Sequence, residues 1–170
     1  MDNCKSDYKS LQLNIREINE FSLQENFEGE QSIEIEAEIS HSILISKCNN
    51  TNIIIKGKAN AVTVENTNRL AIVLDDLISS VDVVKSQNFA LQVMGVIPTV
   101  LMDQIDGAQI YLSKESSSTR VFSSKSSGIN LNVVHGPDDD FKEIPLAAQI
   151  CSYFDEKKGD VVNEIVSHAG

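Results

Sequence analysis

The sequence has few of the residues that stabilise small secreted domains or line ligand pockets. It contains no Trp, three Pro, eight Gly and three Cys, and aromatic residues make up 5% of the chain. The cysteines (Cys4, Cys48 and Cys151) lie far apart, so we expect free thiols in a reducing compartment. No apolar run resembles a signal peptide or approaches the roughly 18 residues of a membrane span. These absences predict a cytoplasmic protein without membrane insertion.

Positive charge is also scarce, and the net charge of −11 is unevenly placed. Residues 1–39 carry ten acidic and three basic residues, and residues 131–170 carry eight and three. The middle, residues 40–130, has eight basic and seven acidic residues. Nucleic-acid binding requires concentrated Lys and Arg, so this balance argues against nucleic acid as a partner. It leaves a nearly neutral middle, with lysines, for contact with a protein.

Short apolar clusters recur about every ten residues through that middle, and many alternate apolar and polar residues as half-buried strands do. They centre near Ile33, Ile43, Ile53, Val62, Ile72, Val81, Leu91, Val100, Ile110, Val121 and Leu131. Segments rich in Asn, Asp, Ser and Gly separate them, as expected of turns. The chain is therefore predicted to be all-β, as an antiparallel sandwich or as a parallel β-helix.

Alignment of every second cluster favours the β-helix moderately. It gives two aliphatic columns, as a stacked core needs: Ile53, Ile72, Leu91, Ile110, Leu131, and Ile43, Val62, Val81, Val100, Val121. The same arithmetic aligns three lysines with two amides: Lys47, Asn66, Lys85, Gln104, Lys125. This ridge is either a contact surface or a solvated edge that lysines protect from aggregation.

The pattern predicts three regions. Residues 1–14 form a flexible polar arm, 15–135 form the repetitive domain, and 136–170 form an acidic loop followed by a hairpin and a tail. Gly159 is expected in the hairpin turn. The arms are too apolar for an exposed tail, so the hairpin is expected to cap its own stack or to cross to a second copy. Its apolar residues are Ile150, Tyr153, Phe154, Val161, Val162, Ile165 and Val166.

A search for catalytic or metal-binding patterns finds no convincing site. His41, His135 and His168 lack metal-ligand spacing. Gly57-Lys58 lacks the first glycine of a phosphate-binding loop, and the run of Asp at 138–140 lacks the alternation of a calcium loop. We therefore expect no enzyme activity, no metal and no cofactor.

One enzymatic alternative concerns the acids Asp75, Asp76 and Asp82. They could mimic the paired carboxylates of solenoid enzymes that cleave sugars. Such enzymes line an open groove with aromatic residues, which are scarce here. A structural role is the stronger expectation.

Several segments resemble the C-terminal domain of cyclase-associated proteins, the actin-monomer-binding family. They are KGKANAV, DVVKS, QIYLSKES and the terminal HAG, in that order, and the resemblance spans about residues 15–170. It implies a right-handed β-helix that forms a homodimer by exchanging its C-terminal hairpin. It also implies binding of ADP-loaded monomeric actin and faster exchange of that nucleotide for ATP. Because the chain has no counterpart of the family's N-terminal helical region, binding to adenylate cyclase is not expected.

The resemblance also implies which residues face actin. They are Lys56, Lys58 and Asn60 in KGKAN, Lys85 and Asn88 in DVVKSQN, Lys114 and Glu115 in LSKES, and the tail residues His168, Ala169 and Gly170. Asn60 and Asn88 could equally be turn or ladder asparagines within the stack. Lysines on a neutral face would help to steer encounter with acidic actin.

Two other functions remain open at this point. One is a β-helix regulator similar to tubulin-folding cofactor C, which would need an inserted arginine; Arg16, Arg69 and Arg120 match no such motif. The other is a β-helix scaffold for a different protein.

Overall fold

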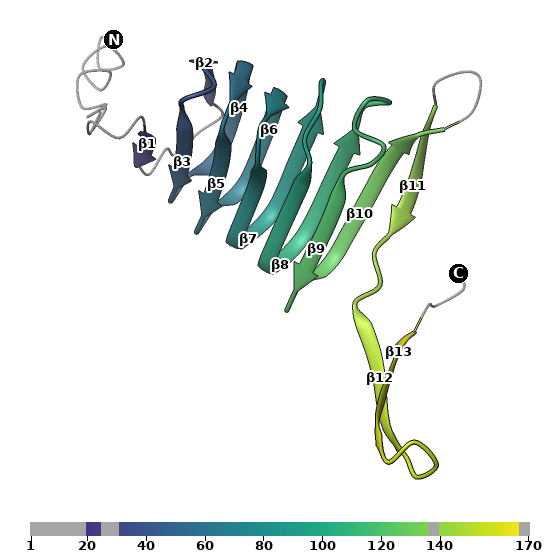
Figure 1. The fold of residues 1–170 in the computed structure, drawn as a ribbon. Helices are drawn as coiled ribbons and strands as arrows, with labels where there is room; N and C mark the ends of the chain where they lie inside the picture. The colour runs from purple at the N-terminus through teal and green to yellow at the C-terminus, as the bar shows by residue number, and fades with distance from the viewer. Residues whose placement is uncertain (1–19, 25–30, 136–139, 167–170) are drawn as a thin grey trace.

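The computed structural model describes residues 20–24, 31–135 and 140–166, which form a β-solenoid of stacked coils and a separate two-stranded hairpin (Figure 1). None of the described residues is helical. The strands are β1 (Glu20–Gln24), β2 (Gln31–Ala37), β3 (Ser42–Ser46), β4 (Asn49–Ala59), β5 (Ala61–Glu65), β6 (Asn68–Leu77), β7 (Ser80–Val93), β8 (Thr99–Leu112), β9 (Arg120–Ser124), β10 (Ser127–Val134), β11 (Phe141–Pro145), β12 (Gln149–Asp155) and β13 (Asp160–Val166). The solenoid decides between the two predicted architectures in favour of the β-helix. The predicted arm at 1–14 lies outside the described residues.

Each coil has two flanks that meet at a corner (Figure 1). The first flank consists of β1, β3, β5, the starts of β7 and β8, and β9. The second flank consists of β2, β4, β6, the ends of β7 and β8, and β10. All neighbours within a flank pair in parallel. In β7 and β8 one strand continues around the corner, whereas the sequence predicted separate short strands with turns between them.

The two predicted aliphatic columns are confirmed residue by residue. Ile53 pairs with Ile72, Ile72 with Leu91, Leu91 with Ile110, and Ile110 with Leu131. On the first flank, Ile43, Val62, Val81, Val100 and Val121 follow one another in the same way. Nearly all of these side chains are buried. Burial of each contributes about 1.5–3 kcal/mol, so the columns are the main stabilising feature of the stack.

The predicted alignment of lysines with amides is also confirmed, and it lies at the corner. All five residues have positive φ: Lys47, Asn66, Lys85, Gln104 and Lys125, with φ from 48° to 58°. Three positions further along, a second column has positive φ as well: Asn50, Arg69, Asn88, Gly107 and Gly128. The left-handed backbone turns the chain between the flanks while the ladder of hydrogen bonds continues. Sequence periodicity located this ridge but gave no sign of its backbone conformation.

A lysine at such a position is strained, since left-handed φ costs an L-residue about 1–2 kcal/mol unless it is Gly or Asn. We therefore expect Lys85→Asn to stabilise the fold by about 1 kcal/mol, or about 3 °C in melting temperature. Thermal unfolding followed by circular dichroism measures this. The matched control is Lys142→Asn on β11, which has no positive φ and should show no gain. An equal gain in both variants would contradict the explanation from backbone strain.

The sequence did not predict β11, which follows the acidic loop and pairs antiparallel with β10. Tyr111 on β8 contacts Phe141 on β11 edge to face, with ring centroids 5.5 Å apart. Leu146 then packs against the core, and its backbone N–H donates to the carbonyl of Ile129 at 2.8 Å. The chain is thus anchored to its own stack as far as Leu146, and the hairpin begins beyond that point.

Two cysteines fall within the described residues, and both are free thiols, as predicted. Cys48 lies inside the corner, where burial raises the pKa of its thiol to about 11. Cys151 is exposed on β12. Because the thiolate is the reactive form, both burial and the raised pKa lower the reactivity of Cys48 at neutral pH.

Candidate partner-binding surface

The end of each second-flank strand is joined to the next first-flank strand along one edge of the stack, which we call the connecting edge. Its successive segments are residues 38–41, 57–60, 75–79, 94–98 and 113–119. Hydrogen bonds hold neighbouring segments together: Ile78 N–H donates to Ala59, Leu77 N–H to Val96, and Gly95 N–H to Asp75. In Figure 1 this edge is the top of the solenoid, and the corner is the bottom.

Asp75 and Asp76 fasten these segments to each other. The Asp75 carboxylate accepts the Gly57 N–H at 2.9 Å, and the Asp76 carboxylate accepts the Val96 N–H at 2.7 Å. Gly95 packs so closely that a Cβ there would lie 2.4 Å from Asp76 Oδ1. These contacts give both acids a structural role, which was the stronger expectation for them.

The KGKAN motif lies at the second of these segments. Lys56 and Glu34 form an ion pair between adjacent coils, with both side chains about half exposed. Lys58 is exposed and lies in register with Asp76. Asn60 donates from Nδ2 to Ser42 Oγ at 3.2 Å, so it serves as a ladder asparagine in the stack.

Lys114 and Glu115 lie at the far end of the same edge, in the segment 113–119. This segment folds back on the preceding coil, because Ser113 Oγ and Ser116 Oγ both donate to the Gly95 carbonyl at 2.7 Å. Both Lys114 and Glu115 are exposed. The fold thus brings KGKAN and LSKES, which are far apart in the sequence, onto one edge, three coils or about 14 Å apart.

Lys85 and Asn88 are separate from this group, because they lie at the corner. Asn88 has φ 50° and donates to Asn68 Oδ1 at 3.2 Å. The corner and the connecting edge are separated by one second-flank strand of about six residues, or about 20 Å. The ten candidate contact residues therefore do not form one cluster. Three of them, His168, Ala169 and Gly170, lie outside the described residues.

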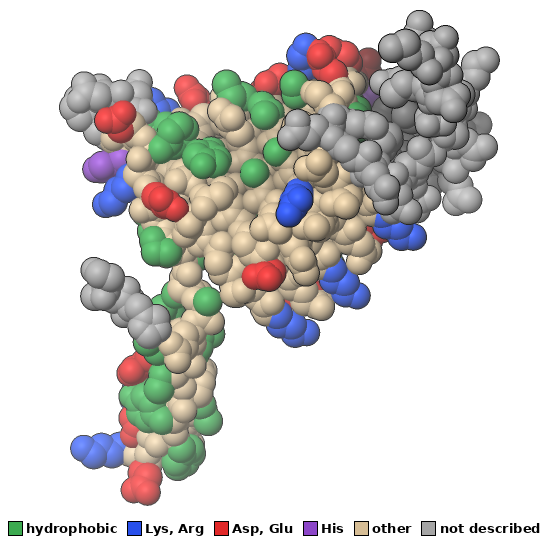
Figure 2. Space-filling model, turned by 180° about the vertical axis from the view of Figure 1, so that it is seen from behind, with side chains coloured by type: hydrophobic (Ala, Val, Ile, Leu, Met, Phe, Trp, Pro, Cys, Tyr) green, Lys and Arg blue, Asp and Glu red, His purple; other side chains and the backbone are tan. Residues whose placement is uncertain are grey.

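The sequence analysis missed the exposed apolar residues of the connecting edge. Ile39 lies on its first segment and is 62% exposed, and three others lie further along the stack. Ile78 is 49% exposed, Met94 54% and Val96 46%. They lie on adjacent coils, between the KGKAN and LSKES segments. Figure 2 shows hydrophobic side chains along the upper edge of the stack. Only the position of a residue within the coil distinguishes these apolar residues from core residues, so composition could not have identified them.

A second apolar surface is the hairpin of β12 and β13, which extends away from the stack (Figure 1). Ile150, Phe154, Val161 and Ile165 are 53–71% exposed, and Tyr153 is 46% exposed. Ile150 pairs with Ile165 and Phe154 with Val161 on one face, while Tyr153 pairs with Val162 on the other. Hydrophobic side chains follow the whole hairpin in Figure 2. The hairpin therefore has apolar groups on both faces, and the structure shows it covered on neither.

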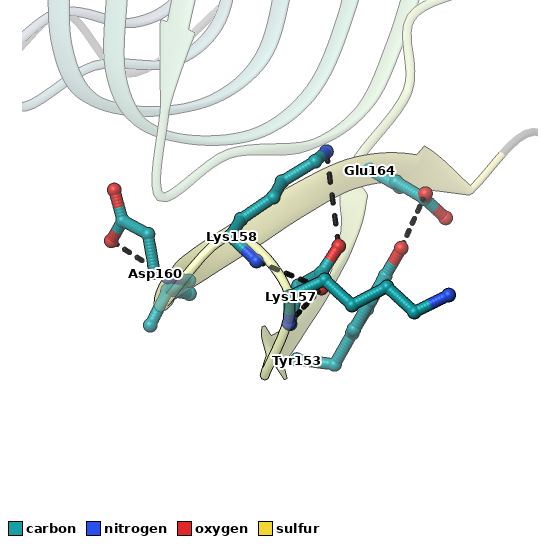
Figure 3. A network of polar contacts seen from close by, with 7 residues as sticks. Tyr153, Lys157, Lys158, Asp160 and Glu164 are labelled. Atoms are coloured by element: carbon teal, nitrogen blue, oxygen red, sulfur yellow. Dashed lines mark hydrogen bonds and ion pairs between the residues drawn. The ribbon is translucent and has the colours of Figure 1, made fainter.

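Polar contacts hold the tip of the hairpin in shape (Figure 3). The Asp155 carboxylate accepts the N–H groups of Lys157 and Lys158, and Gly159 has φ 67°, which confirms its predicted place in the turn. Tyr153 donates to Glu164 Oε1 at 3.0 Å, and this hydrogen bond raises the pKa of the tyrosine. The hairpin is thus a defined arm.

Within the described part of the chain, no three His, Cys, Asp or Glu side chains are grouped as metal ligands would be. His41 accepts the Glu38 N–H at Nδ1, which closes a turn. Across the same residues, no helix has the length and apolar character needed to cross a membrane.

The stacked parallel coils define this domain as a β-solenoid. Residues 13–168 match the family model described as "Adenylate cyclase associated (CAP) C terminal". The chain belongs to this family, as its motifs suggested.

Named relatives agree with this assignment. The adenylyl cyclase-associated protein of Schizosaccharomyces pombe is 44% identical over 131 residues, which are 77% of this chain and 23% of the relative. Human adenylyl cyclase-associated protein 1 is 35% identical over 147 residues, 86% of this chain and 30% of the relative. The chain thus spans less than a third of the length of these relatives.

A solved structure shows the same fold. The crystal structure of cyclase-associated protein from Cryptosporidium parvum has a TM-score of 0.84 and 25% sequence identity, covering 92% of this chain and 96% of that one.

Proposed function

We propose that this chain binds monomeric actin in its ADP-bound form and promotes exchange of the bound nucleotide, in the cytoplasm. Family membership supports the proposal, and the observation that carries it is the alignment of KGKAN and LSKES on the connecting edge. Lysines in both segments complement an acidic partner. Binding energy would favour an actin state that holds nucleotide less tightly, which is a coupling between two sites and involves no bond chemistry.

The test is release of a fluorescent nucleotide from ADP-actin, with and without the protein. We expect acceleration at sub-stoichiometric amounts. Saturable binding to actin without faster nucleotide release would mean that the protein only sequesters monomers. Absence of both binding and acceleration would overturn the proposal.

The lysines of KGKAN provide the second test. We expect Lys56→Ala with Lys58→Ala to weaken actin binding about tenfold, since each charge contributes about 0.5–1 kcal/mol at an exposed interface. The melting temperature should change little, because the Lys56–Glu34 pair is half exposed and such pairs add at most about 1 kcal/mol. The control is Lys47→Ala with Lys125→Ala at the corner, which removes the same charge. An equal loss of binding in the control would mean that total charge, and not this edge, is what matters.

The tail residues 168–170 match the terminal HAG of the family, and we propose that they take part in nucleotide exchange. Removal of residues 168–170 is expected to slow nucleotide exchange at least threefold while affinity for actin changes less than twofold. Exchange rate and affinity are measured on the same preparation, with the unchanged chain as reference. Equal losses in both would make the tail only an anchor.

We also propose a homodimer in which the hairpins are exchanged. An isolated two-stranded hairpin is at best marginally stable in water, so one with two apolar faces needs a partner surface. The first flank supplies one. Among the described strands, β9 pairs only with β8, so its other edge is open, and Phe122 on β9 is 53% exposed. A second copy's hairpin could cover both.

A further inference from the structure

Three exposed apolar side chains are grouped on the connecting edge, two coils away from the exposed Ile39. Ile78 and Met94 each expose about half of their surface, as does Val96, whereas Leu77 and Ile97 beside them are buried. Exposed apolar residues are ordinary when scattered singly. These three lie together on two adjacent coils, since the Leu77 N–H donates to the Val96 carbonyl at 3.0 Å. We call them the edge cluster.

Charged side chains lie on the coils on either side of the edge cluster. Lys58 lies on the coil before it, and Lys114 on the coil after it. An apolar centre with charged residues around it is the usual composition of a protein–protein interface, in which a few central side chains supply most of the binding energy. The surface extends over about 14 Å along the stack, enough for such a centre.

The backbone beneath the edge cluster is held rigidly on both sides. Asp76 accepts the Val96 N–H, and Ser113 and Ser116 both bind the Gly95 carbonyl. A side chain at Gly95 would collide with Asp76. Because the segment is already ordered, little conformational entropy is lost when a partner binds. Met94 is unbranched and can adapt its shape to the partner.

We propose that Ile78, Met94 and Val96 form the apolar centre of the surface that contacts monomeric actin, with Lys58 and the loop of Lys114 at its margin. This inference rests on the proposed function and adds to it residues that none of the family motifs contains. Position indicates the occupant, because the cluster lies between KGKAN and LSKES, the two segments on which the proposed function rests. Lys58 and Lys114 at its margin lie beside Asp76 and Glu115, so the margin carries charge of both signs. The lysines would then influence the rate at which the two proteins associate. The edge cluster would set the rate at which the complex dissociates.

The experiment compares Ile78→Ser with Met94→Gln, made together, against the unchanged chain. Binding to fluorescent ADP-actin is followed by stopped flow at two salt concentrations. We expect affinity to fall at least tenfold, mainly through faster dissociation, with the salt dependence of association unchanged. Lys56→Ala with Lys58→Ala should instead slow association and reduce its salt dependence. If the double variant folds poorly, the single variant Met94→Gln serves as the test. Its affinity for ADP-actin is expected to fall at least threefold.

The control is Leu101→Gln, an apolar residue on the first flank that is 41% exposed, which should bind as the unchanged chain does. If the unchanged chain binds actin and both cluster variants bind equally well, the inference is wrong and the proposed function stands. If the unchanged chain does not bind actin, both are wrong. A loss of affinity in Leu101→Gln equal to that in the cluster variants would also overturn the inference, because the effect would then not be specific to the edge.

Discussion

Removal of residues 150–170 is expected to convert a dimer into a monomer while the solenoid stays folded. The hairpin exposes apolar side chains on both faces, and Leu146, just before it, anchors the chain to its own stack. Deletion beyond that anchor removes the hairpin proposed to be exchanged and leaves the coils intact. Light scattering should give the mass of two protomers before deletion and of one after it, with an unchanged β-sheet spectrum.

A point variant separates exchange from simple truncation. Ile150→Asn with Phe154→Asn alters one face of β12 and should also give a monomer. The matched control is Lys157→Ala with Lys158→Ala at the tip, which keeps the apolar faces and should remain dimeric. A monomer for the unchanged chain would exclude the exchanged dimer altogether.

The second large effect is expected at Gly57, the second residue of KGKAN. Gly57 has φ 87°, and a Cβ there would lie 2.6 Å from the Ala37 carbonyl oxygen on the adjacent coil. Gly57→Ala therefore combines backbone strain with a backbone collision. We expect it to lower the free energy of unfolding by about 3 kcal/mol. For a chain of this size that lowers the melting temperature by about 6–12 °C.

The control for Gly57 is Gly107→Ala. Gly107 also has positive φ, 78°, but the nearest atom to its added Cβ is 3.8 Å away. Gly107→Ala should lower the free energy of unfolding by about 1 kcal/mol, because it adds backbone strain without a collision. Thermal unfolding of both variants measures the difference, which isolates the collision with Ala37. Equal losses would mean that the coils separate at little cost and that the edge is less rigid than its contacts indicate.

The core of this fold was predictable because periodicity alone determines which residues face inward. Ile53, Ile72 and Leu91 could be placed in one column from their spacing, and the strand register agrees. The shape of the coil was not predictable in the same way. It depends on left-handed backbone angles at residues such as Lys85, where a lysine gives no local signal of positive φ.

The candidate surface was predictable only in part, for a related reason. Motif resemblance selected Lys56, Lys58 and Lys114, and the coil spacing places them along one edge. Lys85 and Asn88 came from the same kind of resemblance but lie at the corner. The exposure of Ile78 and Met94 depends on where the chain leaves the second flank, and hydropathy carries no information about that point.

The loop at residues 113–119 has a consequence for how such domains can diverge. Corner residues follow one another at intervals of 19 from Lys47 to Gln104, whereas Lys125 follows Gln104 by 21. The two additional residues are absorbed in this loop, and the flanks on either side keep their pairing, as Thr99 with Arg120 and Asp106 with Ser127 show. Insertions here leave every core column in place. The length of this loop can therefore change without the loss of stability that substitutions inside the coil would bring.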